Sequence, residues 1–550
     1  MDQYTRDVLE LGISRRSFLS RGAVGVAGLG MFGLHGFAAE TADSLEDSCG
    51  SFGKSSDGGA ALFFLPRPKR IAENDIKATL TFDVVVVGAG ASGVPAALSA
   101  AESGAKVGVV QKAPFALSQG NTGCGIDLAT SDQAGVEALV ARLIADNDHR
   151  CNPNLIRKWA YNSGEAVRWV IDRSKQAGSP VVNQGSGAQL NILKVNGYTL
   201  NYVTSFFGPK PYTNGDGMRH LAMTAEKAGV QFFYNMPAVQ LIQNQSGEVQ
   251  DVIAKGMDGK YTKFRANKGV IVATGDYQNN KAMSDYFLPD TKNFGRKQMG
   301  KTGDGFAMVY WAGGVIEPIG HTKMLHDFDG GPASMCDMPF LAVDREGKRF
   351  VNETAPMSVL NNYLRDASNA GHYSQIFDSN YMAQAANWPG KLVSPEGMKN
   401  YMPEEPGPKK GVFESFINTY RADTIEELAK KLGHDPVTLA ATVKRYNEIV
   451  ASGKDSDFGK PSQMLFPIEK PPFYGIHRTL RISAIVSGVL VDENHRVLDA
   501  EGKPIKGLYA IGNLGGGFYG GIDYPLTVFG LSLGRCYTFG YLTGKHVAKL

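Results

Sequence analysis

The clearest hydrophobic pattern in the chain lies between residues 82 and 111. Residues 82–87 are dominated by valine, and an apolar, β-branched run of this length is typical of a buried parallel strand. The alanine-rich stretch 94–103 predicts a helix, and residues 106–111 predict a second strand. Strand, helix and strand in this order form a βαβ unit, so the pattern predicts an α/β fold.

The turn between the first strand and the helix is rich in glycine. Gly88, Gly90 and Gly93 follow the GxGxxG spacing, with Ala91 and Ser92 between them. Glycines there let the backbone approach a pyrophosphate, and the helix N-terminus offers N–H groups and a partial positive charge. Because the motif lies between a strand and a helix, its context predicts a dinucleotide-binding turn.

The end of the second strand departs from the usual pattern of such a domain. An acidic residue commonly binds the ribose there, but this strand ends in Gln111, which is followed by Lys112. An amide can hydrogen-bond a hydroxyl, although without the strength of a charged acceptor. We therefore expect Gln111 and Lys112 to contact the ribose side of the dinucleotide.

The N-terminal residues resemble an export signal. Residues 14–20 read SRRSFLS and precede a glycine-punctuated apolar run that ends near residue 39. Paired arginines before a short apolar stretch are typical of a twin-arginine signal, and the run is shorter than a membrane span requires. The sequence predicts a signal peptide at 1–39, a loose leader at 40–80, and export to the periplasm or cell surface by the twin-arginine machinery.

The composition is that of an ordinary globular protein of two or three domains. The 550 residues are 43% hydrophobic and 20% charged, and the formal net charge is +3. So small an excess of positive charge, without a run of lysine or arginine, argues against nucleic acid as a partner. The five cysteines are scattered and form no CxxC motif, so no metal site is predicted, while a cluster built from distant cysteines stays open.

Four further motifs extend this picture along the chain. They are SQGNTGCGIDLA at 118–129, GVIVATGDY at 269–277, TGDG at 302–305 and GLYAIGNLGGGFYGG at 507–521, the last followed by a predicted helix at 527–549. Together with the dinucleotide turn they resemble the fumarate reductase and 3-ketosteroid dehydrogenase superfamily of FAD flavoproteins. The resemblance covers residues 82–550 and extends to bacterial flavin reductases such as the cardiac glycoside reductases.

The resemblance implies a Rossmann-like FAD-binding domain that is split in the sequence. Its parts would be 82–320 and 485–550, with an inserted α+β capping domain at 321–484. Members with covalent FAD carry a histidine at the position that matches Asn121, so FAD is expected to be bound non-covalently. Ala238 would meet the adenine, and Asn513 stands where the family usually has glutamate. The other residues that the resemblance places around FAD are Ser118, Thr122, Gly125, Thr274, Gly275, Asp304, Ser532 and Leu533.

Several residues that fumarate reductases use are replaced here. The proton-donating arginine matches Met357, a histidine before a late glycine pair matches Ala484, and the C-terminal substrate arginine matches Thr527 or its neighbours. A dicarboxylate needs paired cations, and His326 alone does not supply them. The resemblance therefore implies a substrate other than fumarate, with Met357 as an apolar wall of the substrate pocket.

The 3-ketosteroid dehydrogenases share another feature, a Tyr-Pro pair after the glycine-rich turn. Here it is Tyr524-Pro525, and the resemblance implies that this tyrosine hydroxyl polarises a substrate carbonyl. A phenol with an ordinary pKa of about 10 suits a neutral carbonyl, and Tyr519 and Asp523 share the same loop. The candidates for the proton donor are His326, Lys323, Arg481 and His477, with Glu353 as a relay or hinge contact.

These features predict an exported FAD-dependent reductase of an activated C=C bond. Its substrate would be neutral or weakly charged and largely apolar, such as an enone, a steroid or a phenylpropanoid. Because the sequence has no second nucleotide fingerprint and no haem-attachment motif, electrons are expected from a separate membrane cytochrome or quinol-linked donor. Two alternatives stay open: a 3-ketosteroid dehydrogenase working in the oxidative direction, and a flavin electron-transfer or ligand-binding protein without turnover.

Overall fold

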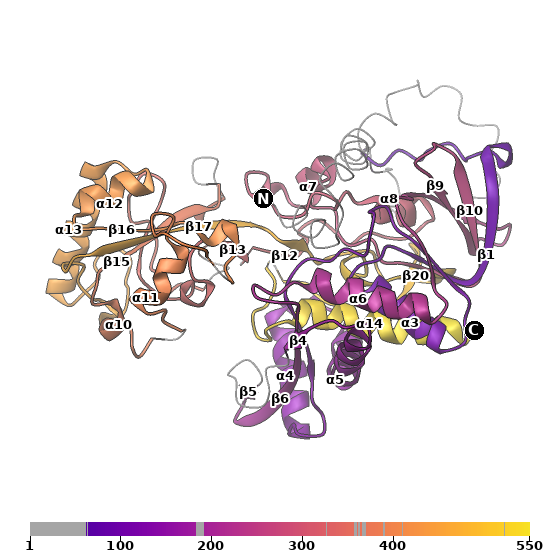
Figure 1. Cartoon of the computed structure of the whole chain (residues 1–550), viewed down its shortest axis with the longest axis horizontal. Helices are drawn as coiled ribbons and strands as arrows, with labels where there is room; N and C mark the ends of the chain where they lie inside the picture. Colours follow the sequence, from indigo (N-terminus) through magenta and orange to yellow (C-terminus); the bar gives the residue numbers. More distant parts are fainter. Residues whose placement is uncertain are drawn as a thin grey trace. The chain divides into compact units, whose positions relative to one another are not determined.

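The computed structural model describes residues 62, 64–182, 192–325, 327–356, 360, 363–365, 370–388, 391–409, 411–521 and 523–550. The predicted signal peptide, most of the leader, His326 and Met357 lie outside these residues. The chain divides into two compact units, whose helices and strands are labelled in Figure 1. The first contains the chain up to Phe287 together with Gln298–Thr322 and Ile485–Leu550, and the second contains Leu288–Lys297 and Lys323–Ala484.

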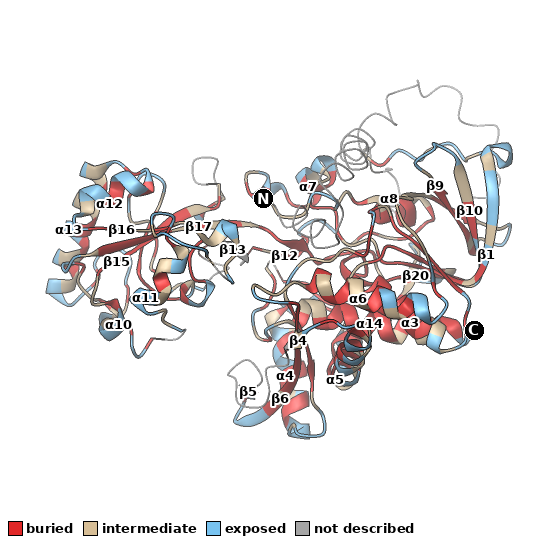
Figure 2. Cartoon of the chain, in the orientation of Figure 1, coloured by how far each residue is buried: buried red, intermediate tan, exposed pale blue. Residues whose placement is uncertain are grey.

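The first unit is built around an eight-stranded sheet. Strand β1 (Ile76–Val87) lies between β10 (Tyr261–Val272) and β2 (Val107–Val110) and runs parallel to both. The last four residues of β1 are all buried, as the valine run predicts, and Figure 2 shows this central part of the sheet as buried. The order is β19-β20-β10-β1-β2-β7, and β8 and β9 extend it from β10. These other strands are β7 (Gln231–Phe233), β8 (Ala238–Gln243), β9 (Val249–Lys255), β19 (Arg496–Leu498) and β20 (Pro504–Ala510).

Three helices lie side by side against this sheet (Figure 1): α3 (Gly93–Glu102), α6 (Asn214–Lys227) and α14 (Leu531–Ala548). Glycines let α14 approach α3, because a Cβ on Gly540 would lie 2.4 Å from Ser92 O and one on Gly544 2.2 Å from Ala96 O. The predicted α/β class and the helices expected at 94–103 and 527–549 are therefore confirmed. No described helix, α14 included, is both long and apolar enough to span a membrane.

A smaller antiparallel sheet completes the first unit. Strand β3 (Thr122–Ile126) pairs with β6 (Tyr198–Phe207), which also pairs with β4 (Val181–Val182) and β5 (Ile192–Val195). Helix α5 (Pro153–Gln176) packs on β3 and begins at Asn152, whose side chain accepts from Asn154 N. The remaining helices of this unit are α4 (Gln133–Asp146), α7 (Lys281–Phe287) and α8 (Asp304–Trp311).

The second unit combines a mostly antiparallel sheet with helices. Strand β17 (Phe473–Ile482) pairs with β15 (His372–Phe377), β16 (Thr419–Ala422), β13 (Asp327–Asp329) and β11 (Gly295–Arg296), and β14 (Leu341–Val343) pairs with β15. Helices α12 (Ile425–Leu432) and α13 (Pro436–Ser452) bury leucine and valine side chains against this sheet. The short elements are α10 (Tyr381–Gln384), α11 (Pro395–Met398), β12 (Lys323–Met324) and β18 (Ala484–Ile485).

Three histidines of the second unit lie buried or half-buried, two of them beside Ser374 and the third beside Thr479. Ser374 Oγ lies 2.9 Å from His434 Nε2 and 3.3 Å from His477 Nδ1, and Thr479 Oγ1 lies 3.1 Å from His372 Nδ1. Burial lowers the pKa of all three imidazoles, and it lowers that of His477 to about 4, with its two histidine neighbours acting in the same direction. The folded protein therefore holds this cluster neutral at mildly acidic pH.

We expect the free energy of unfolding to fall as the pH drops from about 6.5 towards 4. In this window the unfolded chain protonates its histidines while the folded chain keeps them neutral, so the unfolded state binds more protons and gains stability. A series of melting temperatures over this range measures the effect. His477→Asn should flatten the slope, and His149→Asn, at an exposed position, should not; equal slopes for both variants would contradict this explanation.

Candidate functional site

The dinucleotide turn lies between the end of β1 and the start of α3. A Cβ on Gly88, whose φ is +103°, would lie 2.6 Å from Ala273 O, and one on Gly93 would lie 1.9 Å from Gly88 O. The fold itself therefore requires glycine at these two positions. A Cβ on Gly90 would meet Leu117 O at 3.5 Å, an ordinary contact, so the surrounding residues leave room for a side chain there. The space at Gly90 suits close approach of a ligand.

The N-terminus of α3 has no side-chain cap among the described residues. The N-cap residue Ser92 makes no capping hydrogen bond, and the first turn carries no acid. Such a terminus presents N–H groups and a partial positive charge, which favour a bound phosphate. Together with the open position at Gly90, this makes the turn fit the pyrophosphate of a dinucleotide.

The ribose-side residues lie where β2 ends. Lys112 Nζ donates to Asp304 Oδ2 at 2.8 Å and to Thr302 Oγ1 at 2.7 Å, so the structure brings together two predicted cofactor residues that are far apart in sequence. Gln111 Nε2 instead donates to Phe115 O at 3.1 Å. The amide nitrogen of Gln111 thus holds its own loop, and its contact with a ribose stays a prediction.

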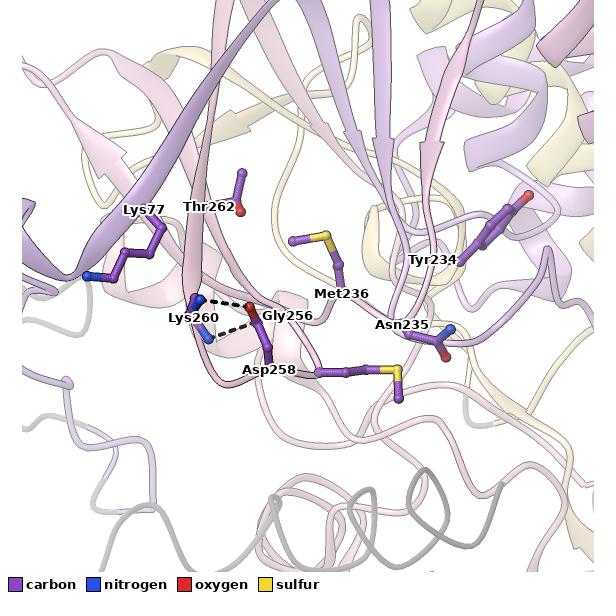
Figure 3. Close-up of a pocket in the computed structure, with 9 residues that line it drawn as sticks. Lys77, Tyr234, Asn235, Met236, Gly256, Asp258, Lys260 and Thr262 are labelled. Atoms are coloured by element: carbon purple, nitrogen blue, oxygen red, sulfur yellow. Dashed lines mark hydrogen bonds and ion pairs between the residues drawn. The ribbon is translucent and has the colours of Figure 1, made fainter. Parts of the chain in front are cut away.

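An open pocket lies beside this end of the sheet (Figure 3). One wall continues from the ribose side, because Met236 N donates to Gln111 O at 2.9 Å and Asn235 N to Ala113 O at 3.1 Å. Ala238, the predicted adenine contact, follows as the first residue of β8. The nine lining residues are Lys77, Tyr234, Asn235, Met236, Gly256, Met257, Asp258, Lys260 and Thr262.

A buried polar group just after β10 lacks a hydrogen-bond partner among the described residues. Thr274 Oγ1 is buried and forms no hydrogen bond within the described residues. It faces α8, since a Cβ on Gly305 would lie 2.0 Å from this oxygen. The next residue, Gly275, has a φ of +78° and lies against the Lys301 side chain. An unpaired hydroxyl beside a positive-φ glycine is the kind of gap that a cofactor with polar edges would fill.

A chain of buried polar side chains runs from this position to α14. Asp276 Oδ2 accepts from Lys301 Nζ at 3.1 Å and from Asn513 Nδ2 at 3.2 Å, and Asn513 Oδ1 accepts from Arg535 Nη2 at 2.8 Å. Asparagine fits here because it donates to a carboxylate and accepts from a guanidinium, whereas glutamate would face Asp276 with a second negative charge. The motif at 269–277 contained Asp276, but nothing in the local sequence identified Lys301 or Arg535.

The predicted isoalloxazine residues lie around β3. Ser118 Oγ accepts from Asn214 Nδ2 at 2.7 Å, and Asn121 Oδ1 accepts from Thr122 Oγ1 at 3.2 Å. Gly125 has a packing reason of its own, because a Cβ there would lie 2.2 Å from Ser163 O on α5. The glycine is therefore explained without a contact to the flavin.

Two tyrosines of the glycine-rich loop face each other. Their ring centroids are 5.3 Å apart; Tyr519 is fully buried, and Tyr524 is nearly so. Tyr524 OH accepts from Ser532 N at 3.0 Å, so the backbone N–H of this predicted cofactor residue binds the hydroxyl, and its contact with FAD stays a prediction. The side chain of Leu533 lies close to Gly120. Helix α14 therefore fixes the Tyr524 ring at its first turn.

Burial raises the pKa of both hydroxyls, Tyr519 and Tyr524, well above the ordinary value of a phenol. The guanidinium of Arg535 lies 4.8 Å from the ring centroid of Tyr519 and acts in the opposite direction on its pKa. Both groups therefore stay protonated at neutral pH and can donate hydrogen bonds. Asp523 Oδ1 accepts from Tyr524 N at 2.8 Å, so this carboxylate stabilises the loop.

The segment that follows the tyrosines is apolar and exposed. Leu526 and Phe529 expose 52% and 47% of their surface, although they lie next to buried residues of the same loop. Residues 523–530 contain no lysine, arginine or histidine. This segment therefore offers hydroxyl groups and apolar surface, and none of its own residues supplies a cation for a carboxylate.

The structure places Glu353, the predicted relay or hinge contact, in a buried ion network, and a relay role stays a prediction. Its carboxylate receives Arg349 Nε at 2.8 Å and Nη2 at 2.9 Å, and Lys460 Nζ lies 3.4 Å away. Arg349 also pairs with Asp455 at 2.8 Å. Burial acts to raise the pKa of Asp455, but Arg349 and three backbone N–H groups outweigh it and hold that pKa below its usual range. All four side chains are at most 6% exposed, so the network holds the second unit together.

The other proton-donor candidates of the second unit also have partners. Lys323 Nζ pairs with Asp290 Oδ2 at 2.9 Å, and His477 belongs to the cluster around Ser374. Arg481 lies on β17, opposite Asp327 of β13 and Gly295 of β11. None of these contacts identifies a proton donor, so the assignment stays a prediction.

Glu353→Gln is expected to lower the free energy of unfolding by about 3 kcal/mol, because it leaves buried cations partly uncompensated. Turnover per folded molecule and FAD content should stay unchanged. Thermal unfolding with flavin absorbance measures both properties. The exposed pair of Glu346 and Lys348 provides the control, since Glu346→Gln should cost less than about 1 kcal/mol. Loss of turnover at unchanged stability would instead support a role for Glu353 as a proton relay.

Known proteins with similar sequences and structures are oxidoreductases. The family model described as the FAD binding domain matches residues 83–524. A vinyl phenol reductase of Lactiplantibacillus plantarum is 27% identical, with 85% of this chain and 97% of the relative covered. A digoxin reductase of Eggerthella lenta is 25% identical, with 96% and 97% covered. The solved open conformation of a flavocytochrome c3 fumarate reductase has a TM-score of 0.65 at 25% identity, with 86% of this chain and 79% of that chain covered.

Proposed function

Because the chain belongs to the FAD binding domain family and is an FAD-dependent oxidoreductase acting on C=C bonds, we propose that it reduces an activated C=C bond in a neutral or weakly charged, largely apolar molecule. The observation that carries this proposal is the pair of neutral tyrosines, Tyr519 and Tyr524, in a loop without a basic residue. Arg535, whose guanidinium lies 4.8 Å from the ring centroid of Tyr519, is buried and bound to Asn513. Residues 523–530 by themselves offer a dicarboxylate no paired cations.

The residues that would hold FAD are those of the dinucleotide turn, Lys112, Asp304 and the polar chain from Asp276 to Arg535. Once reduced by the electron donor, bound FAD would supply the hydride that adds to one carbon of the C=C bond, and the other carbon would take a proton from one of the predicted donors, whose assignment stays a prediction. The Tyr524 hydroxyl then donates a hydrogen bond to the oxygen that activates this bond, where negative charge grows in the transition state. Its raised pKa keeps the proton on the phenol, so Tyr524 polarises the substrate and does not act as a base.

Leu526 and Phe529 fit the apolar part of this substrate class. Their exposed side chains follow Tyr524 directly, so an aromatic or alicyclic skeleton could bury them while its oxygen reaches the hydroxyl. The names of two relatives, vinyl phenol reductase and digoxin reductase, point to the same class. Met357, which lies outside the described residues, is proposed as a further apolar wall.

We also propose that FAD is bound non-covalently, that the protein is exported, and that a separate membrane cytochrome or quinol-linked protein supplies electrons. Asn121 carries an amide, which cannot form the covalent bond that a histidine forms to flavin. Denaturation with acid should therefore release all of the flavin into the supernatant. The arginine pair at 15–16 supports export, and cell fractionation of wild type and an Arg15→Lys, Arg16→Lys variant tests it.

An anaerobic screen with reduced methyl viologen as donor tests the catalytic proposal. Vinyl phenol and digoxin represent neutral acceptors, and fumarate represents dicarboxylates. We expect viologen oxidation with at least one neutral acceptor and none with fumarate. Turnover of fumarate at a higher rate than any neutral acceptor, or no turnover of any acceptor in a broad panel, would refute the proposal.

A further inference from the structure

The glycine-rich loop at 515–521, which carries Tyr519 and leads to Tyr524, is held by side chains from several segments. Gly517 N donates to Glu317 Oε1 at 3.0 Å, Gly520 N donates to Asn147 Oδ1 at 3.1 Å, and Thr322 Oγ1 donates to Gly521 O at 2.5 Å. Among these side chains Glu317 is the one that carries a charge. Glu317 is not among the site residues that the sequence predicts.

The Glu317 carboxylate is inserted between two stretches of backbone, one at Gly488 and one at residues 516–517. Besides Gly517 N, it accepts from Gly488 N at 2.5 Å, and Glu317 N donates back to Gly488 O at 2.9 Å. A Cβ on Gly516 would lie 2.5 Å from Glu317 Oε2, so only glycine lets the loop pass this close. Part of the residue remains accessible, but its carboxylate is enclosed. The carboxylate therefore binds two backbone N–H groups, and the glycine at 516 leaves the space that it occupies.

The charged and titratable groups around this carboxylate come from three other elements. Arg535 of α14 and Arg150, just before α5, both act to lower its pKa, and His321 Nε2 lies 2.8 Å from Glu317 O. Burial outweighs the arginines and the two N–H groups and raises the pKa of Glu317 to about 7. His321 is itself kept neutral, since burial lowers its pKa to about 4.

Arg535 connects this carboxylate to the tyrosines. Its guanidinium lies 4.8 Å from the ring centroid of Tyr519 and 5.5 Å from that of Phe518, and its Nη1 lies 3.4 Å from Gly515 O. Glu317 and Arg535 thus hold neighbouring peptides of the same loop, one by its N–H and one by its C=O. Displacement of either peptide would move Tyr519 and, through it, Tyr524.

We propose that Glu317 is a positioning residue for the reaction, whose ionised carboxylate fixes the loop so that the Tyr519 and Tyr524 hydroxyls keep their places. This inference rests on the proposed function of the tyrosines. A carboxylate accepts two N–H groups at once because it carries no hydrogen of its own. Replacement by glutamine directs an amide hydrogen towards one of the two N–H groups and breaks that bond, and protonation weakens the acceptance of both.

Hydrogen exchange of the FAD-loaded protein tests the inference without any substrate. At pH 8, Glu317→Gln should exchange faster than wild type in peptides that span 486–490 and 512–524. The matched control Glu501→Gln, in an exposed turn of the same unit, should exchange like wild type. If Glu317→Gln folds poorly, Glu317→Asp keeps the charge and should show a smaller increase than the glutamine variant. Unchanged exchange in both peptides would refute the inference.

Kinetics with vinyl phenol as the probe then separate the two proposals. Wild-type kcat/KM should rise as the pH passes through about 7, whereas Glu317→Gln should lose this rise and be slower by about 10-fold at pH 8. An identical pH profile in both proteins would refute positioning by Glu317. If wild type turns over no acceptor while the exchange rates change as expected, the proposed function fails and the hold of Glu317 on the loop stands.

Discussion

Gly90→Val is expected to leave the chain folded and to weaken FAD binding by at least about 100-fold, which corresponds to about 2.7 kcal/mol. The nearest described atom to a Cβ at this position is Leu117 O at 3.5 Å, so the fold tolerates a side chain there. The same side chain would occupy the space over the N-terminus of α3 where a pyrophosphate has to approach. Titration of the apoprotein with FAD, followed by flavin fluorescence, gives the affinity, and circular dichroism reports the fold.

Gly93 provides the contrast that makes this prediction specific. A Cβ there would lie 1.9 Å from Gly88 O, so Gly93→Ala should lower the melting temperature sharply before any ligand is considered. The two variants therefore separate a glycine required by packing from a glycine required by the ligand. Wild-type affinity for FAD in folded Gly90→Val would show that the dinucleotide does not pass over this turn.

The parts of the fold that could be predicted from sequence depend on short-range patterns. The valine run, the GxGxxG spacing and the alanine-rich stretch lie within one βαβ unit, and α3 and the end of β1 lie where they predict. The C-terminal helix was predicted to start at 527 but starts at Leu531. Gly530, with a φ of +79°, precedes it, and the residues before it turn the loop that carries Tyr524. A hydrophobic pattern does not report such a turn.

The polar network of the site could not be predicted, because its members come from four distant segments. Asp276 and Asn513 lie in motifs that the sequence singles out, but Lys301 and Arg535 have unremarkable local sequences, and only the sheet and α14 bring the four together. Glu353 also shows what a local sequence does not report. It was predicted as a relay or hinge contact, which stays a prediction, but Asp455 and Lys460, about a hundred residues later, complete a buried ion network with Arg349 around it.

Tyr524→Phe is expected to lower kcat/KM for a neutral acceptor by about 10²- to 10³-fold, the usual cost of removing one donor to a developing oxyanion. FAD affinity should change little, because the ring keeps its packing against Tyr519 and only the hydroxyl is lost. Anaerobic turnover with vinyl phenol and reduced viologen measures the effect. Tyr541→Phe is the matched control, since its hydroxyl binds Glu165 on α5 and should be dispensable for turnover.

Tyr519→Phe decides how the two hydroxyls share this task. They influence each other's pKa, and Tyr524 alone is bound to the N-terminus of α14 through Ser532 N. If Tyr519 acts by orienting Tyr524, the double variant should be hardly slower than Tyr524→Phe, because the effects of coupled residues are not additive. Independent effects that multiply would give both hydroxyls their own contact with the substrate. Full activity of Tyr524→Phe would show that another group polarises the substrate. It would also remove the main argument for a neutral, oxygen-bearing substrate.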